Sequence, residues 1–238
     1  SYTASAETYN CDPNGNGTTT SGAALAIAQH TTKKNINVMI SGGTFTGVRA
    51  LSESNPQAND PAPEVTLSIT DGTFNGDVTL ADKDHTSIAG GTFSTEPANE
   101  YIAKGYTKER DNGKWNVVPD TTKTYVAQVG VNKYVSLADA LTAAQDGDTV
   151  KLVGNISTDE GIGVAKKITL DMAEYTITSS VNQVFTVTGS GDLTITGNGT
   201  IAGPTGGAAK DLDSKAVLMV SGESAKLTVL NGTITAGG

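Results

Sequence analysis

The chain is short of the residues on which many protein classes depend. Its 238 residues include one cysteine, one tryptophan and two histidines, and only 5% of them are aromatic. A single cysteine, Cys11, cannot form an intrachain disulfide, which excludes a small disulfide-stapled scaffold. Neither His30 nor His85 is close to Cys11 in the sequence, so a zinc site, which needs about four ligands, is not expected.

Positive charge and long apolar runs are also scarce. The chain has 16 Lys and Arg against 25 Asp and Glu, a formal net charge of −9. Without a basic stripe to release counterions from a phosphate backbone, nucleic acid is not an expected partner. No apolar run approaches the roughly 20 residues that a membrane-spanning helix needs, so membrane insertion is not expected either.

Threonine and glycine are abundant instead. The sequence holds 35 Thr and 28 Gly, spread along its whole length. β-Branched residues favour strands and glycine permits tight turns, so this composition predicts an all-β protein built of many short strands.

A six-residue phrase recurs along the chain. It consists of an apolar residue, any residue, one of Gly, Asp or Asn, then Gly, then Thr, and finally Phe or Ile. It occurs at Ile40–Phe45, Ile69–Phe74, Ile88–Phe93 and Val229–Ile234, with a longer relative at Ile195–Ile201. Alternating residues before it would face a core, the glycine would supply a sharp corner, and the Phe or Ile would return to the core. A β-sandwich gives less reason for one corner to recur, so the phrase favours a right-handed parallel β-helix, a solenoid with loops of variable length.

The middle of the chain carries the features expected at the ends of a solenoid. Residues 105–118 form two alternating runs around an Asn-Gly pair, which predicts a β-hairpin. Residues 136–145 predict a short capping helix, because Ser136 is a favoured N-cap residue and mostly Leu and Ala follow it. The chain therefore divides into two portions: 1–119, the C-terminal portion of one β-helix module ending in a hairpin cap, and 120–238, the N-terminal portion of a second module opening with a hairpin and the helix.

This order leaves open coils at both ends of the sequence. A linker of about four residues spans at most about 14 Å, whereas a stack of eight coils is roughly 38 Å long. The two portions are therefore not expected to rejoin within one chain. We expect the open coils to be completed in one of two ways: by head-to-tail association with other copies, or by neighbouring modules of a tandem array. The alternative is that the ends of this sequence simply do not coincide with module boundaries.

The predicted opening and closing segments resemble known modules. Residues 136–152, followed by Ile168–Asp171, resemble the opening of pectin-lyase-like right-handed β-helices. The run from Ile88 through Tyr101–Tyr106 to Pro119 resembles module endings in large surface proteins of gut-type Gram-positive bacteria. The resemblance implies an extracellular adhesin or stalk, associated with the cell surface or wall and generally without catalysis.

The sequence gives little basis for chemistry. β-Helix lyases and glycosidases use clustered carboxylates with Arg or Lys, but no acidic pair recurs here at coil spacing, and Asp82, Asp84 and His85 form only a small acidic loop. The loop Asp12–Gly17 matches the start of a calcium loop, yet Ala23 stands where the bidentate Glu would be. We therefore expect no enzyme, no catalytic residues, no cofactor and no metal site.

Ligand binding has one aromatic candidate. Trp115, Tyr101 and Tyr106 are the local cluster that could contact a host or wall glycan, although packing against the last coil is the simpler interpretation. The expected function is a non-catalytic structural and adhesive stalk or fibre of a bacterial surface protein. A carbohydrate-binding β-helix module is the alternative, and a polysaccharide lyase-like enzyme the second alternative.

Overall fold

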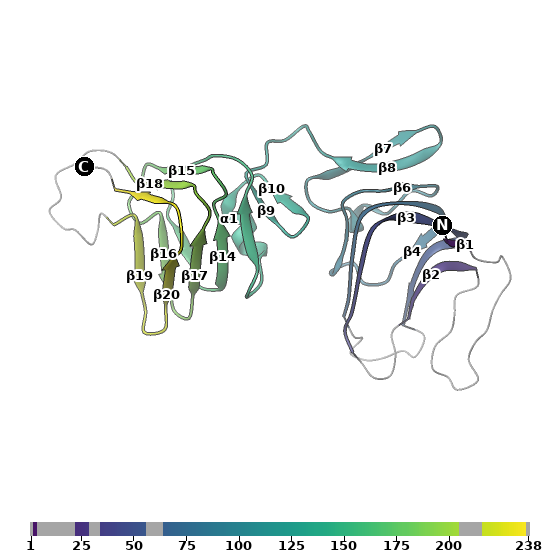
Figure 1. The fold of residues 1–238 in the computed structure, drawn as a ribbon, viewed down its shortest axis with the longest axis horizontal. Helices are drawn as coiled ribbons and strands as arrows, with labels where there is room; N and C mark the ends of the chain where they lie inside the picture. Colours follow the sequence, from purple (N-terminus) through teal and green to yellow (C-terminus); the bar gives the residue numbers. More distant parts are fainter. Residues whose placement is uncertain (1, 4–21, 29–33, 56–63, 205–215, 237–238) are drawn as a thin grey trace. The chain divides into compact units, whose positions relative to one another are not determined.

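The computed structural model describes residues 2–3, 22–28, 34–55, 64–204 and 216–236 (Figure 1). Strands dominate these residues and a single α-helix accompanies them, so the predicted all-β class is confirmed. The chain divides into two compact units, Ser1–Thr121 and Thr122–Gly238. Cys11, His30 and the candidate calcium loop lie outside the described residues.

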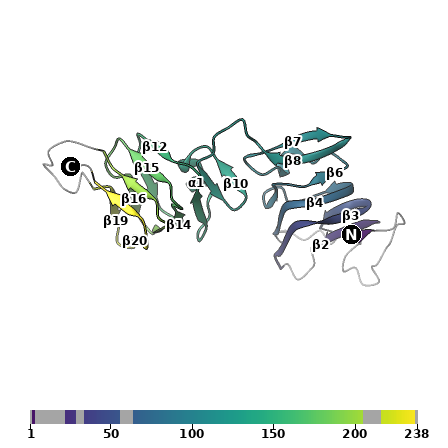
Figure 2. The same ribbon diagram turned by 45° about the horizontal axis from the view of Figure 1, so that its top comes forward.

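The first unit is one sheet in the order β1-β3-β4-β6-β8-β7, with β2 added to β3 and β5 added to β4. Figure 2 shows β2, β3, β4 and β6 as successive layers that end at the β7–β8 hairpin. The elements are β1 (Tyr2–Thr3), β2 (Ala23–Ala28), β3 (Ile36–Ser54), β4 (Val65–Thr79), β5 (Thr86–Ile88), β6 (Thr92–Phe93), the 3-10 turn η1 (Asn99–Tyr101), β7 (Tyr106–Asp111) and β8 (Lys114–Pro119).

β3 and β4 are long because each turns corners without losing its neighbour. They pair in parallel from Ile36↔Val65 to Ser52↔Thr79, with register shifts at the glycine-containing corners. Gly43 has φ +96° and Gly72 has φ +133°, a conformation that side-chain-bearing residues rarely adopt. The recurring phrase thus marks a corner, as its glycines predict.

The phenylalanine of the phrase forms a column inside the first unit. Phe45, Phe74 and Phe93 stack with ring centroids 5.1 and 4.7 Å apart and with nearly parallel planes. A Cβ on Gly72 would lie 3.1 Å from the Phe74 ring, and one on Gly91 would lie 3.3 Å from the Phe93 ring. The glycine therefore serves a second purpose, because its bare Cα leaves room for the ring that follows it.

The predicted hairpin closes this sheet. β7 and β8 pair antiparallel around Asn112 and Gly113, which both have positive φ, and β8 also pairs antiparallel with β6. The sheet is therefore mixed: its strands from β1 to β6 pair in parallel, and the hairpin adds through its second strand, β8, which runs antiparallel to β6.

The second unit contains three sheets. Their orders are β10-β9-β11-β14-β17-β20, β12-β15-β18-β21 and β13-β16-β19. The strands are β9 (Ala127–Val129), β10 (Asn132–Tyr134), β11 (Thr149–Leu152), β12 (Ile156–Thr158), β13 (Ile162–Val164), β14 (Lys167–Asp171), β15 (Thr176–Ser179), β16 (Phe185–Thr188), β17 (Asp192–Thr196), β18 (Thr200–Ala202), β19 (Leu218–Ser221), β20 (Lys226–Val229) and β21 (Thr233–Thr235). Apart from the β9–β10 hairpin and its pairing with β11, all neighbours run parallel.

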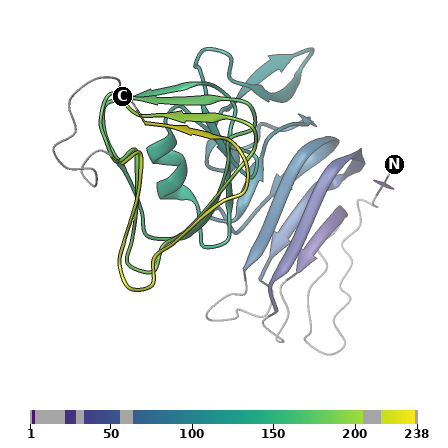
Figure 3. The same cartoon turned by 60° about the vertical axis from the view of Figure 1, so that its left-hand side comes forward.

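The chain visits these three sheets in turn. β11, β12 and β13 are followed by β14, β15 and β16, then by β17, β18 and β19, and each strand pairs with its counterpart one round later. Figure 3 shows the strands of this unit as successive loops drawn one behind another. Inward residues such as Leu170 and Ile195 are Cα partners and are fully buried, whereas threonines form outward columns, Thr149 beside Thr169, then Thr194, then Thr228.

The helix α1 spans Leu137–Ala143, close to its predicted range. Ser136 is its N-cap, with a hydroxyl that accepts a hydrogen bond from the Asp139 amide at 3.1 Å. Its buried face, Leu137, Ala140 and Leu141, joins the core of the second unit. The Leu and Ala residues that follow the cap therefore include the face that packs.

Candidate functional site

Trp115 lies on β8, where its Cα partner is Phe93 of β6. The side chain is half-buried and packs against the core of the first unit. Lys108 Nζ lies 5.7 Å and Arg110 Cζ lies 5.6 Å from the centroid of its ring. Such cation–π contacts are worth about 0.5–1 kcal/mol at exposed sites, so a sugar that stacks on the ring must compete with the cations of the neighbouring strand.

Lys108 is also held by groups other than the indole. Its Nζ donates to Glu96 Oε1 at 2.6 Å and to the Pro97 carbonyl at 2.8 Å, and only 11% of its side chain is exposed. The cation beside Trp115 is therefore fixed in place rather than free to move aside for a ligand.

The two tyrosines of the aromatic cluster pack on the same core as Trp115. The Tyr101 hydroxyl donates to the Leu80 carbonyl at 3.0 Å. Burial, with the nearby carboxylate of Glu100, raises the pKa of this phenol above its ordinary value. Tyr106 is half-buried at the start of β7. The structure thus brings all three predicted residues to one core, and engages the Tyr101 hydroxyl with the backbone.

A second group of polar side chains surrounds the acidic loop 82–85. Asp82 faces the His85 ring, whose Nδ1 lies 2.9 Å from its Oδ2, while His85 Nε2 lies 3.5 Å from Glu64 Oε2. Glu53, only 3% exposed, accepts hydrogen bonds from the amides of Ala81 and Asp82. Two carboxylates therefore flank the imidazole, and a third carboxylate holds the loop that carries it.

The loop geometry lowers the pKa of Asp82 below its ordinary value. Burial acts first and would raise the pKa, but hydrogen bonds from the Val65 amide and from the ring and amide of His85 outweigh it. These donors favour the charged carboxylate. The ionised form of Asp82 thus ties the start of β4 to the loop.

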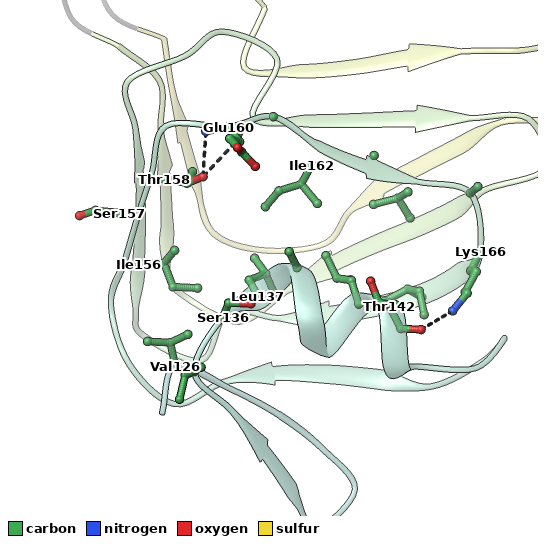
Figure 4. A pocket seen from close by; sticks show the side chains of 18 of the residues that line it. Val126, Ser136, Leu137, Thr142, Ile156, Ser157, Thr158, Glu160, Ile162 and Lys166 are labelled. Carbon is green, nitrogen blue, oxygen red and sulfur yellow. Dashed lines mark hydrogen bonds between the residues drawn. The ribbon is translucent and has the colours of Figure 1, made fainter. Parts of the chain in front are cut away.

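The second unit has a pocket of about 710 Å³ between α1 and the strands β12 and β13 (Figure 4). Leu137, Ile156 and Ile162 point into it, whereas Ser157 points away. β12 pairs only with β15 and β13 only with β16 within the described part of the chain, so the pocket lies along two open sheet edges. Ten of its 19 lining residues are apolar. Several of these, such as Leu141, Val164 and Ile168, belong to the core of the unit.

The polar groups of this pocket are mostly satisfied within the protein. Lys166 Nζ donates to the Thr142 and Ala144 carbonyls at 2.8 and 2.7 Å, at the C-terminal end of α1. The Thr158 hydroxyl donates to the Glu160 carbonyl and accepts from the Glu160 amide. Figure 4 places Glu160 and Lys166 on different sides of the pocket. The arrangement suits the contact of an apolar surface better than proton transfer between paired groups.

Glu53, Glu64 and a pocket beside the helix are not predicted by any local pattern in the sequence. Glu53 follows a buried run, Ala50–Ser52, but only two of its residues are apolar, so no pattern in the sequence marks Glu53 as buried. The pocket depends on how far α1 covers the first strands, which no local pattern specifies.

Within the residues described, no three His, Cys, Asp or Glu side chains form a group that could hold a metal ion. The one helix found there is too short to cross a membrane. No family model, curated protein or solved structure matches this chain.

Proposed function

We propose that both units are portions of right-handed parallel β-helix modules, and that the chain is a non-catalytic structural and adhesive segment of an extracellular bacterial surface protein. The observation that carries this proposal is the register of the strands. β14, β17 and β20 lie side by side in parallel, and so do β15, β18 and β21, with like residues above one another.

The connections between the strands support a right-handed coil. The chain leaves β14, passes through β15 and β16 in two other sheets, and returns to β17 beside β14. Connections of this kind between parallel neighbours in one sheet are right-handed in about 98% of cases. A right-handed coil is therefore the form proposed for both units.

The division between buried apolar and outward polar side chains supports a mechanical role. Inward columns such as Ile40, Ile69 and Ile88 are buried, and the outward positions carry mainly threonine and other small polar residues. This pattern stabilises a stack through repeated burial of apolar surface and needs no reactive group. The surface setting itself rests on the resemblance of residues 88–119 to module endings in surface proteins.

The enzyme alternative has a direct test. The chain is incubated with uronate polymers, and new unsaturated sugar ends are followed by ultraviolet absorbance, with a pectate lyase as positive control. We expect no increase over buffer. A rise proportional to protein concentration, abolished by heating, would overturn the non-catalytic proposal.

The carbohydrate-binding alternative is tested on a glycan array with the full chain. Trp115→Ala removes the candidate platform, and Arg110→Ala removes one of the two cations beside the same ring while leaving the ring in place. We expect no specific signal from any of the three proteins. A signal lost in Trp115→Ala but kept or increased in Arg110→Ala, with both variants folded by circular dichroism, would favour the binding module instead.

A further inference from the structure

The last strands of the second unit have an uncovered edge. β19, β20 and β21 pair with β16, β17 and β18, and no strand of the described chain lies on their other side. The inward side chains of this last round are substantially exposed: Val220 45%, Val229 43% and Ile234 37%. Their partners one round earlier are buried: Val187 0%, Ile195 1% and Ile201 0%. Within the described residues, this last round therefore leaves an apolar face uncovered.

The first unit has the complementary edge. Ile36–Ile40 of β3 pairs with β4, and β2 pairs with the end of β3, while the preceding side of both is unpaired among the residues that the structure describes. Among the described residues, β20 has no paired strand on the side away from β17, and Ile36–Ile40 has none on the side away from β4. Joining the two continues the stack in the same direction with parallel pairing.

The corner phrase fixes one register for this joint. Val229–Thr235 and Ile40–Thr46 share the same spacing: an apolar residue, two variable residues, Gly, Thr, an apolar residue and Thr. Aligning Val229 with Ile40 places the inward Leu227 on Val38 and the outward Thr228 on Met39, which is 79% exposed.

Charge supports the same register independently. Counting back from Val229 and Ile40 by six residues brings Glu223 onto Lys34. Both side chains are exposed, one on the turn before β20 and the other just before β3. Opposite charges therefore meet in the alignment that the corner phrase selects, whereas a one-residue slip would also turn the apolar row outward.

We propose that the last strands of the second unit bind a second copy of this chain, with β20 against Ile36–Ile40 and β19 against β2 of that copy. This rests on the proposed function, which it deepens by naming the partner and the register. The interface joins two different surfaces, so it is head to tail and extends into open chains rather than a closed dimer.

One strand competes with this joint. β1 pairs with Phe45 and Thr46 of β3, the place that β21 would take when β20 lies on Ile36–Ile40. Full association therefore requires that β1 leave its position. Removal of residues 1–3 is expected to increase association, which distinguishes this joint from nonspecific aggregation.

Disulfide trapping tests the register. Two versions of the 238-residue chain carry Cys11→Ser and one new cysteine each. The first has Thr228→Cys, and the second has Met39→Cys and an affinity tag. Neighbouring parallel strands place these Cα atoms about 4.8 Å apart, within the 4.4–6.8 Å that a disulfide accepts. Mild oxidation of the mixture should give the heterodimer as the main product, with a higher yield after deletion of residues 1–3.

The matched control replaces Met39→Cys with Ser68→Cys, the same column one strand further in. That position lies roughly 10 Å from Thr228 in the proposed stack, so the heterodimer should be lost. Absence of the Thr228–Met39 product, or equal trapping at Ser68, would overturn the inference. Neither result bears on catalysis or glycan binding, so a failure here remains separate from a failure of the proposed function.

Discussion

Phe74 is the middle ring of the phenylalanine column, and its replacement by leucine tests whether the column stabilises the first unit. The ring is fully buried, with Phe45 on one side and Phe93 on the other at 5.1 and 4.7 Å. Phe74→Leu keeps an apolar side chain in the site and removes both ring contacts. The substitution therefore separates the contribution of ring stacking from that of apolar burial as far as one change allows.

The expected cost follows from the two lost pairs. Each aromatic pair contributes about 0.5–1.5 kcal/mol beyond the burial of its area, so their loss lowers the free energy of unfolding by about 1–3 kcal/mol. Phe185→Leu is the matched control, because Phe185 is also fully buried and no ring pairs with it in the described part of the chain. Phe185→Leu loses the same side-chain volume and therefore carries the same kind of cavity cost, but it loses no stacked ring.

Urea denaturation can follow the two units separately. Trp115 is the only tryptophan and belongs to the first unit, so its fluorescence reports on that unit, while far-ultraviolet circular dichroism follows both. We expect Phe74→Leu to lower the fluorescence midpoint by more than Phe185→Leu lowers the transition of the second unit. Equal or smaller destabilisation by Phe74→Leu would refute the idea that stacked rings hold the first unit together.

Three further predictions concern single sites. Thr86→Val should raise the free energy of unfolding of the first unit by about 1 kcal/mol, because the buried Thr86 hydroxyl has no hydrogen-bond partner in the described structure; a loss of stability in urea would contradict this. Gly199→Ala should destabilise the second unit by about 1–3 kcal/mol or more, since a Cβ there would strike the Tyr175 carbonyl. Gly163→Ala, where a Cβ meets nothing within 4 Å, should be neutral or stabilising, and equal effects of the two would show that close approach is not the cause. The pKa of the Asp82 carboxyl is lower in the folded than in the unfolded chain. Its charge therefore stabilises the fold at pH values above the unfolded-state pKa of about 3.9. This contribution is lost as the pH falls through the folded-state pKa. The stability difference between the wild type and Asp82→Asn should therefore shrink below about pH 4 in acid titrations, and a difference that stayed constant would exclude this role.

Local signals accounted for the parts of the fold that depend on neighbouring residues. Ser136 and the apolar positions after it predicted α1, because a cap and a buried face are encoded within one turn or two. The Asn112-Gly113 pair predicted the β7–β8 hairpin for the same reason. The corner phrase predicted turns at Gly43 and Gly72, where the backbone needs positive φ.

Long-range features were not available from local patterns. Glu53 is buried because amides from the loop after β4, 28 residues later, close over it. Lys108 and Arg110 flank Trp115 only once β7 lies beside β8. The pocket beside α1 depends on how completely a helix covers open strand edges, which is a property of packing rather than of sequence spacing.

In the second unit, successive rounds of the chain stack in parallel with like residues in one column. Thr169, Thr194 and Thr228 form such an outward column in β14, β17 and β20. In a Cys11→Ser background, Thr169→Cys with Thr194→Cys should form an intrachain disulfide under mild oxidation, because neighbouring strands are about 4.8 Å apart. Thr169→Cys with Thr228→Cys, two strands apart, should not, because the separation of roughly 10 Å exceeds disulfide reach. Mass spectrometry of the unreduced monomers decides between the two, and trapping of the distant pair, or failure of the adjacent pair, would contradict the stacked architecture.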